Sequence, residues 1–187
     1  MNTLSTLFSL VIQVYTMILL LRIWMQWARC DFYNPFAQFI VKATQPIIGP
    51  LRRFIPAMGP IDTASLLIAL VLCVVKVFLN PYISVTSILI PLSAILVLFK
   101  TIGSLIFWVL LAMAIMSWVS QGRSPVEYVL IQLTEPLLRP IRNLLPSMGG
   151  IDFSPMILVL LMYVINMGVM ELLTNVAVPL AYIWGWA

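Results

Sequence analysis

Histidine is absent from this sequence of 187 residues, and charged residues make up only 9% of it. Without histidine the chain lacks the commonest metal ligand and proton shuttle in proteins, and it cannot carry a Ser-His or Cys-His catalytic pair. A soluble domain carries about 25% charged residues, so this chain could not cover its surface in water. These two absences exclude histidine-dependent enzymes and point to a membrane protein.

Other chemical signatures are missing too. The two cysteines, Cys30 and Cys73, fall at an expected cytoplasmic interface and inside an expected span, so neither a disulfide nor a metal site is predicted. No phosphate-binding Gly-rich loop and no Gly-x-Ser-x-Gly motif is present. The ten lysines and arginines are few and lie among membrane-seeking apolar residues, which argues against nucleic-acid binding. The sequence therefore predicts no enzyme, no cofactor and no nucleic-acid partner.

Long apolar runs dominate the chain instead. Apolar residues make up 63% of it, and the mean hydropathy is +1.10, which predicts an all-α membrane protein with several spans. The first run, Leu4–Trp27, is too long for a signal-peptide core, and no lysine or arginine precedes it. Arg22 and Arg29 are the first basic residues. Because cytoplasmic flanks attract basic residues, this helix is expected to start outside and end in the cytoplasm.

The chain contains an internal repeat. Nine of nineteen positions are identical between Thr44–Asp62 and Thr134–Asp152, ninety residues apart. The repeated segment is rich in proline and carries an arginine and an aspartate in each copy. A charged, proline-rich segment that recurs between long apolar runs indicates a duplication of a span, a loop and a second span.

Each copy of the segment follows a helix-start signal. Asn34-Pro35 and Ser124-Pro125 place a capping side chain before a proline that suits the first helical position. The helices that follow are amphipathic and too short to span a bilayer of about 30 Å, so they are expected to lie in the membrane interface. The prolines of the repeated segment are expected to break it into short pieces. Asp62 and Asp152 are expected to cap the next spans.

Charge decides the number of spans. With a single crossing between the two motif loops, eight basic residues fall on one side, leaving only Lys76 and Lys100 for the other. We therefore expect four spans, cytoplasmic motif loops and periplasmic termini. Residues 82–99 could form a connector, a re-entrant segment or an extra span. The expected repeats are 1–90 (spans at about 4–27 and 61–79, loop 28–60) and 91–187 (spans at about 92–119 and 151–173, loop 120–150, and a C-terminal anchor).

The doubled pattern Thr-(Gln/Glu)-Pro-x-x-x-Pro-x-Arg-x-x-x-Pro-x-Met-Gly-x-Ile-Asp resembles the YggT family of small bacterial and plastid membrane proteins, over essentially the whole chain. The first copy departs from the fuller motif, because Gly49 stands where the second copy has Arg139. The resemblance implies a physiological context for the protein, and it implies no particular reaction. Relatives are associated with tolerance of osmotic or ionic stress, with genes near cell-division genes, and in plastids with the assembly of membrane complexes.

Two groups of residues are candidate sites. The motif charges could bind anionic lipid headgroups or a partner, or face each other across a pseudo-twofold axis. Alternatively, the arginines mark topology and the aspartates cap helices. These residues are Arg52, Asp62, Arg139, Arg142 and Asp152. The second group, placed in the outer halves of the spans, could form an ion route or a structural ion pair of Lys100 with Glu171 beside snorkelling lysines. It comprises Lys76, Lys100, Asn166 and Glu171.

The function expected from these features is that of a non-enzymatic inner-membrane protein that supports ion or osmotic homeostasis, directly or through a partner. The alternative is a scaffold or assembly factor for membrane-protein or cell-division complexes. Four spans leave little room for a pore in one subunit, so a transport role would require a homo-oligomer.

Overall fold

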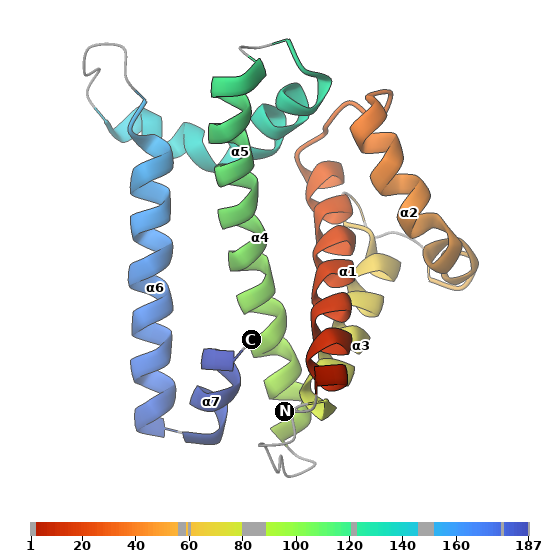
Figure 1. The fold of residues 1–187 in the computed structure, drawn as a ribbon, viewed down its shortest axis with the longest axis vertical. Coiled ribbons are helices and arrows are strands. Elements are labelled where there is room, and N and C mark those ends of the chain that lie inside the picture. The colour runs from red at the N-terminus through yellow and green to blue at the C-terminus, as the bar shows by residue number, and fades with distance from the viewer. Residues whose placement is uncertain are drawn as a thin grey trace.

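The protein is helical throughout its described secondary structure. The computed structural model describes residues 3–55, 59, 61–79, 89–120, 123–145, 152–176 and 178–186. Figure 1 shows the seven helices, which are α1 (Thr3–Trp27), α2 (Pro35–Leu51), α3 (Thr63–Phe78), α4 (Ile90–Ser120), α5 (Pro125–Leu144), α6 (Ser154–Val176) and α7 (Val178–Trp186).

Three of these helices, α1, α4 and α6, are long and apolar enough to cross a membrane. The expected all-α membrane protein is therefore confirmed. The expected second span, at about 61–79, holds the apolar helix α3, but its 16 residues reach only about 24 Å, less than the ~30 Å hydrocarbon core, and it is not among the helices long enough to cross a membrane. Residues 90–99 open α4, whereas residues 82–88 of the expected connector lie outside the described part of the chain.

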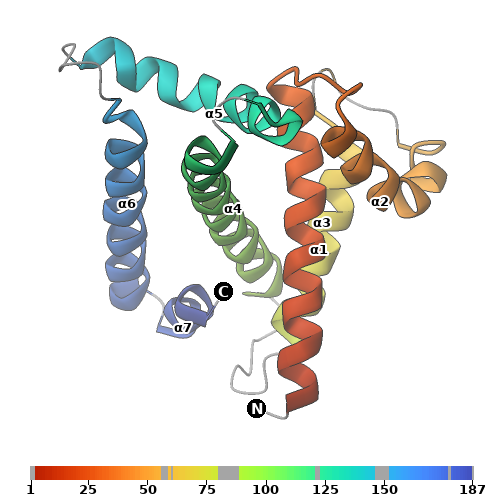
Figure 2. The ribbon, with the colours of Figure 1, turned by 45° about the horizontal axis from the view of Figure 1, so that its top comes forward.

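The short helices α2 and α5 begin at the predicted caps. The Asn34 side chain accepts a hydrogen bond from the Phe36 amide at 3.0 Å, and Ser124 accepts one from the Val126 amide at 3.2 Å. Helix α5 runs across the ends of the spans towards α6, and α2 lies beside α1 (Figure 2). Both helices thus lie in the half of the molecule away from the two chain termini, with α5 at its end and α2 alongside α1 (Figure 1).

The expectation that proline breaks the repeated segment is wrong for the four prolines that the structure describes, whereas Pro56 and Pro146 lie outside the described residues. Pro46 and Pro50 lie inside α2, and Pro136 and Pro140 lie inside α5. A proline removes the hydrogen bond to the carbonyl four residues earlier. Because Pro46 and Pro50 stand four residues apart, with Lys42 a further four before them, the lost bonds share one face of α2. That face is exposed, so water can bind the freed carbonyl oxygens.

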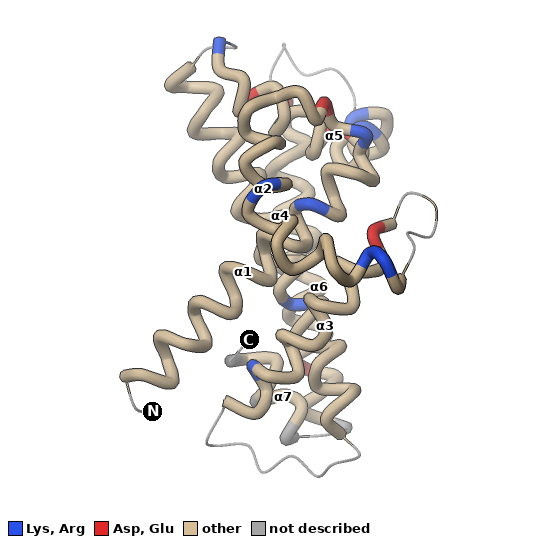
Figure 3. Tube along the Cα trace, turned by 90° about the vertical axis from the view of Figure 1, so that its right-hand side faces the viewer, with Lys and Arg blue, Asp and Glu red and all other residues tan. Residues whose placement is uncertain are grey.

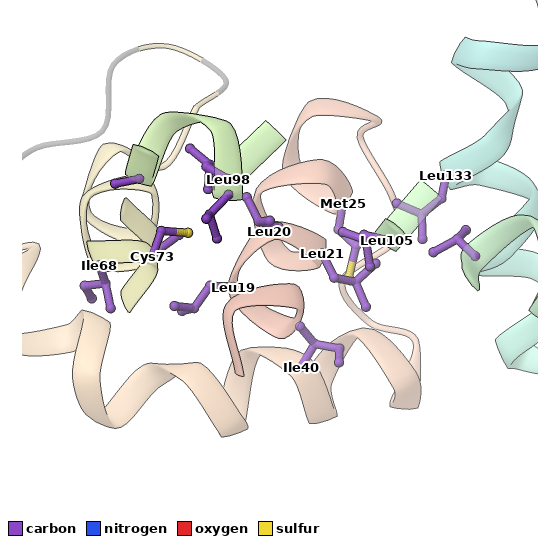
Figure 4. Packing of buried hydrophobic residues seen from close by; sticks show 14 of the residues in the cluster. Leu19, Leu20, Leu21, Met25, Ile40, Ile68, Cys73, Leu98, Leu105 and Leu133 are labelled. Atoms are coloured by element: carbon purple, nitrogen blue, oxygen red, sulfur yellow. The ribbon is translucent and has the colours of Figure 1, made fainter. Parts of the chain in front are cut away.

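The main core lies where α1, α3 and α4 meet. Leu19, Met25, Cys73 and Val97 are completely or almost completely buried there, and Figure 4 shows side chains of this cluster meeting between the helices. The corresponding second-copy pair, α4 and α6, is held apart instead, and the two helices are bridged by α5 at one end and α7 at the other (Figure 1). In the most apolar window of α6 only 6% of residues are buried, against 39% in α4. The two copies are therefore packed very differently.

Candidate functional site

The first copy of the motif forms a clasp between α2 and α3. Asp62 precedes α3, is completely buried, and accepts hydrogen bonds from the Ser65 amide at 3.4 Å and from the Ser65 hydroxyl at 2.7 Å. Arg52 grips the same carboxylate with two prongs: Nη2 lies 2.5 Å from Oδ2, and Nε lies 3.4 Å from Oδ1. The predicted Arg52 and Asp62 are thus brought together in the two-pronged geometry that suits arginine and a carboxylate.

A third residue of this clasp was missed by sequence reasoning. Arg22 of α1, buried, places Nε 3.5 Å from Asp62 Oδ2. Its Nη1 donates to Thr44 Oγ1 at 2.6 Å and its Nη2 to Gln45 Oε1 at 3.3 Å. The sequence pattern indicates only that Arg22 marks the cytoplasmic end of the first helix. The signal that could have found it is an arginine inside an apolar run, where a charge needs a partner.

The first clasp carries an excess of positive charge. Burial alone would raise the pKa of Asp62, but hydrogen bonds from Arg52 and Ser65 outweigh it and hold that pKa below its ordinary value. One carboxylate therefore faces two arginines, Arg22 and Arg52. A cavity of about 520 Å³ opens beside them, lined by Arg22, Gln26, Phe32, Val41, Gln45 and Arg52. Such a cavity can take an anion that binds arginine.

The second copy forms an exposed clasp between α5 and α6. Arg142 places Nε and Nη2 each 2.8 Å from Asp152 Oδ2, and its Nη1 lies 2.6 Å from Glu135 Oε2. The side chains of Arg142 and Asp152 are 40% and 42% exposed. Burial alone would raise the pKa of Asp152, but hydrogen bonds from Ser154 and Arg142 together outweigh it and lower that pKa overall. Arg139 is exposed and joins no ion pair among the described residues.

The two clasps carry opposite net charge because two positions differ. Ninety residues after Arg22 stands Ala112, and ninety residues after Gln45 stands Glu135. The first clasp therefore has two arginines on one carboxylate, and the second has one arginine between two carboxylates. The basic residues gather mainly in the half of the molecule that holds α2 and α5 (Figure 3).

The clasps do not pair with each other. Within the described ranges, each ion pair of the motif joins residues of one copy. The hydrogen bonds between the copies come from uncharged groups: Asn34 Nδ2 donates to the Pro125 carbonyl at 2.7 Å, and the Asp31 amide donates to Gln132 Oε1 at 3.1 Å. The start of α2 in the first copy therefore contacts the start of α5 in the second copy, whereas the motif charges of the two copies do not contact each other.

The intramembrane polar residues separate into two places. Lys76 is buried, rather than snorkelling at a lipid-facing surface, and its Nζ lies 3.2 Å from Gln13 Oε1 of α1. Lys100 Nζ donates to Asn166 Oδ1 at 2.5 Å, which joins α4 to α6. The expected pairing of Lys100 with Glu171 is wrong. Glu171 lies five residues, or about 140°, around α6 from Asn166, and its side chain is exposed on another face.

Chemistry at a metal or thiol finds no support in the described part of the chain. No group of three His, Cys, Asp or Glu residues there could hold a metal ion. Cys30 and Cys73 are both free and buried. Burial raises the pKa of the Cys30 thiol to about 11, so this cysteine is not an activated nucleophile at neutral pH.

Comparison with known proteins decides the family. The family model described as CCB3/YggT matches residues 1–83 and again residues 92–173. The chain belongs to the CCB3/YggT family. The double match of this YggT chain brackets the two clasps, one in each matched segment.

Relatives of this YggT chain share most of its length. It is 72% identical over 173 residues to the Escherichia coli K12 protein named "Uncharacterized protein YggT", covering 92% of each chain. A Vibrio alginolyticus protein named for the proC 3'region is 54% identical over 84% of this chain and 88% of its own. A Haemophilus influenzae protein is 40% identical over 87% of this chain and 89% of its own. No solved structure matches the chain. None of these printed names states an activity.

Proposed function

We propose that this YggT protein is a non-enzymatic protein of the inner membrane that supports ion and osmotic homeostasis, directly or through a partner. Its motif loops face the cytoplasm and both termini face the periplasm. The gathering of basic residues around α2 and α5 supports this orientation, because lysine and arginine are enriched on cytoplasmic flanks.

One observation carries the proposal: the same clasp is buried in one copy and exposed in the other. Asp62 and Arg22 are almost inaccessible to solvent, whereas Arg142, Glu135 and Asp152 are all at least 40% exposed. Salt weakens exposed ion pairs more than buried ones, because dissolved ions reach the exposed groups and compete for them. The second clasp is therefore more sensitive to ionic strength than the first, in which Asp62 and Arg22 are buried.

The consequence of weakening the second clasp falls on α6. This helix has few buried residues, and the clasp ties its first turn to α5 through Asp152. A rise in cytoplasmic salt after water loss loosens that tie and frees the α5 end of α6, while the first copy stays closed. The protein thereby converts ionic strength into a change in the position of one span.

Anionic lipid headgroups are the proposed ligands of the first clasp. Arg52 is 38% exposed and borders the 520 Å³ cavity together with Arg22. A phosphate there would balance the second arginine, which Asp62 alone cannot neutralise.

The alternative role as a membrane scaffold is favoured by the exposed apolar side chains of the cytoplasmic segments. Phe39, Phe54 and Tyr128 are each more than half exposed. These residues could dock a partner protein, or rest in the lipid interface. Co-purification of a stoichiometric partner from native membranes, lost in Phe54→Ser, would favour the scaffold.

The proposal is tested in a strain whose growth at high salt depends on this protein. Arg142→Gln removes the exposed clasp, and Arg139→Gln is its matched control, because it removes the same charge from a neighbour that joins no ion pair within the described ranges. We expect Arg142→Gln to lose salt tolerance and Arg139→Gln to keep it at equal membrane levels. Wild-type growth of both variants across the salt series would refute the role of the clasp. Purified protein in liposomes then decides between a direct ion flux and a role through a partner.

A further inference from the structure

An apolar cleft lies between α4 and α6. It has a volume of about 660 Å³, within the range of roughly 300–1,000 Å³ typical of ligand sites. Its walls include Phe99 and Phe107 from α4 and Met162 and Val169 from α6. Both helices are long and apolar enough to cross the membrane, so the cleft lies at membrane depth.

A positive charge stands at one end of this cleft. Lys100 Nζ donates to Asn166 Oδ1 at 2.5 Å and lies 5.0 Å from the centre of the Trp184 ring. Trp184 Nε1 donates to the same Asn166 oxygen at 3.2 Å, which fixes the amide in place. Neither partner is negatively charged, and no carboxylate of the described chain pairs with Lys100. An ammonium group has three N–H donors, and one of those of Lys100 is hydrogen-bonded to a described residue.

The first copy shows what normally fills this space. Ninety residues before Gly103 and Asn166 stand Gln13 and Lys76. Those two side chains lie 3.2 Å apart and join α1 directly to α3. In the second copy Gly103 contributes no side chain, and α4 and α6 are left separated by the cleft. Gly103 is thus one of the residues that line the cleft, at the position where the first copy has Gln13.

The depth of Lys100 fits a headgroup at the membrane surface. Helix α4 has 31 residues and is therefore about 46 Å long, so it exceeds the ~30 Å hydrocarbon core by roughly 8 Å at each end if it overhangs equally. Lys100 stands ten residues, or about 15 Å, from Ile90 and hence about 7 Å inside the core. A lysine side chain can extend towards the headgroups over that depth. From there the cleft runs along α4 towards Phe107.

We propose that this cleft binds one anionic phospholipid, with its phosphate at Lys100 and an acyl chain along α4 and α6. Charge complementarity selects this occupant, because the site offers an ammonium without an acidic partner above an apolar trough. The lipid takes the place that Gln13 and Lys76 occupy in the first copy, and it completes the contact between the two spans. The site is separate from the arginine clasps and does not rest on the proposed homeostatic role.

Native mass spectrometry of the purified full chain tests the site, with phosphatidylglycerol and phosphatidylethanolamine supplied in equal amounts. We expect one retained lipid, with a preference of about 10-fold for phosphatidylglycerol. Both lipids offer a phosphate to Lys100, but only phosphatidylethanolamine carries an ammonium that competes for that phosphate and repels the lysine. Lys100→Gln should abolish the preference, and Gly103→Leu should abolish retention by filling the cleft. Lys100→Arg should keep the preference, as should Lys42→Gln, the control that removes a surface lysine of α2.

Three results would overturn the proposal. One is an unchanged preference in Lys100→Gln, and another is full lipid retention in Gly103→Leu. The third is a wild-type dimer without bound lipid, which would mean that a second copy of the chain fills the cleft. If Lys100→Gln does not fold, the other two variants still test the site. Lys100→Arg keeps the positive charge and should keep the lipid preference, whereas Gly103→Leu fills the cleft and should lose the lipid.

Discussion

Replacing each capping aspartate by asparagine should affect stability very unequally. In Asp62→Asn the buried Arg22 loses its one acidic partner among the described residues, and Arg52 loses its carboxylate. Breaking a buried ion pair by removing one partner costs about 3–5 kcal/mol. Asparagine still caps a helix well, so capping contributes little to this loss. Asp152→Asn should cost only about 0.2–1 kcal/mol, because exposed pairs are worth that much.

The measurement is reversible unfolding in mixed micelles, followed by tryptophan fluorescence as the denaturing detergent is increased. The dependence of the unfolding free energy on pH, measured towards acid, gives a second test of the contribution of Asp62. Because the folded-state pKa of Asp62 is below its ordinary value of 3.8, its stabilisation is present in full above that value and is lost as the pH falls through the folded pKa. Wild type and Asp62→Asn should therefore converge only in acid. Equal losses for the two variants at pH 7 would refute the distinction between a buried and an exposed clasp.

Three further outcomes are expected. Arg142→Lys should insert normally but impair stress tolerance, because lysine cannot reproduce the two-pronged grip; full activity at equal membrane levels would reduce this arginine to a topology marker. Reporter fusions after Arg53 and after Arg142 should both read cytoplasmic and a fusion at Ala187 periplasmic, and opposite readings for the two loops would contradict the charge argument. Asn34→Ala should destabilise more than Ser124→Ala, by about 1 kcal/mol in the same unfolding assay, since Asn34 also donates a hydrogen bond to the second copy; equal losses would mean that this bond contributes nothing.

The parts of the fold that follow local rules could be predicted from sequence. Apolar runs located α1, α4 and α6, and an Asn-Pro or Ser-Pro pair located the starts of α2 and α5. The ten-residue spacing of Arg52 and Asp62 also led to the correct pair, because the aspartate sits at a helix start. Each of these predictions needs only the segment itself and its neighbours.

What could not be predicted depends on how distant segments pack. Arg22 joins the first clasp because α1 lies against α2 and α3, and its role as a topology signal concealed that contact. Lys100 contacts Asn166 and not Glu171, because only one face of α6 turns towards α4. The prolines of α2 are expected from sequence to break the helix, because each removes a backbone hydrogen bond. Their exposed position, where water can bind the freed carbonyl oxygens, depends on how α2 packs.

The sparse packing of α6 has a consequence for biosynthesis. A span that gains little from its neighbours must be stable in lipid as a single helix, so the lipid alone decides its insertion. With a mean hydropathy of 2.2 in its best window, α6 meets that requirement. By contrast, α3 is short and relies on α1 and α4 to cover its buried lysine. The first three membrane-embedded helices are therefore expected to enter the bilayer as a group, and the last one independently, after the rest of the protein is in place.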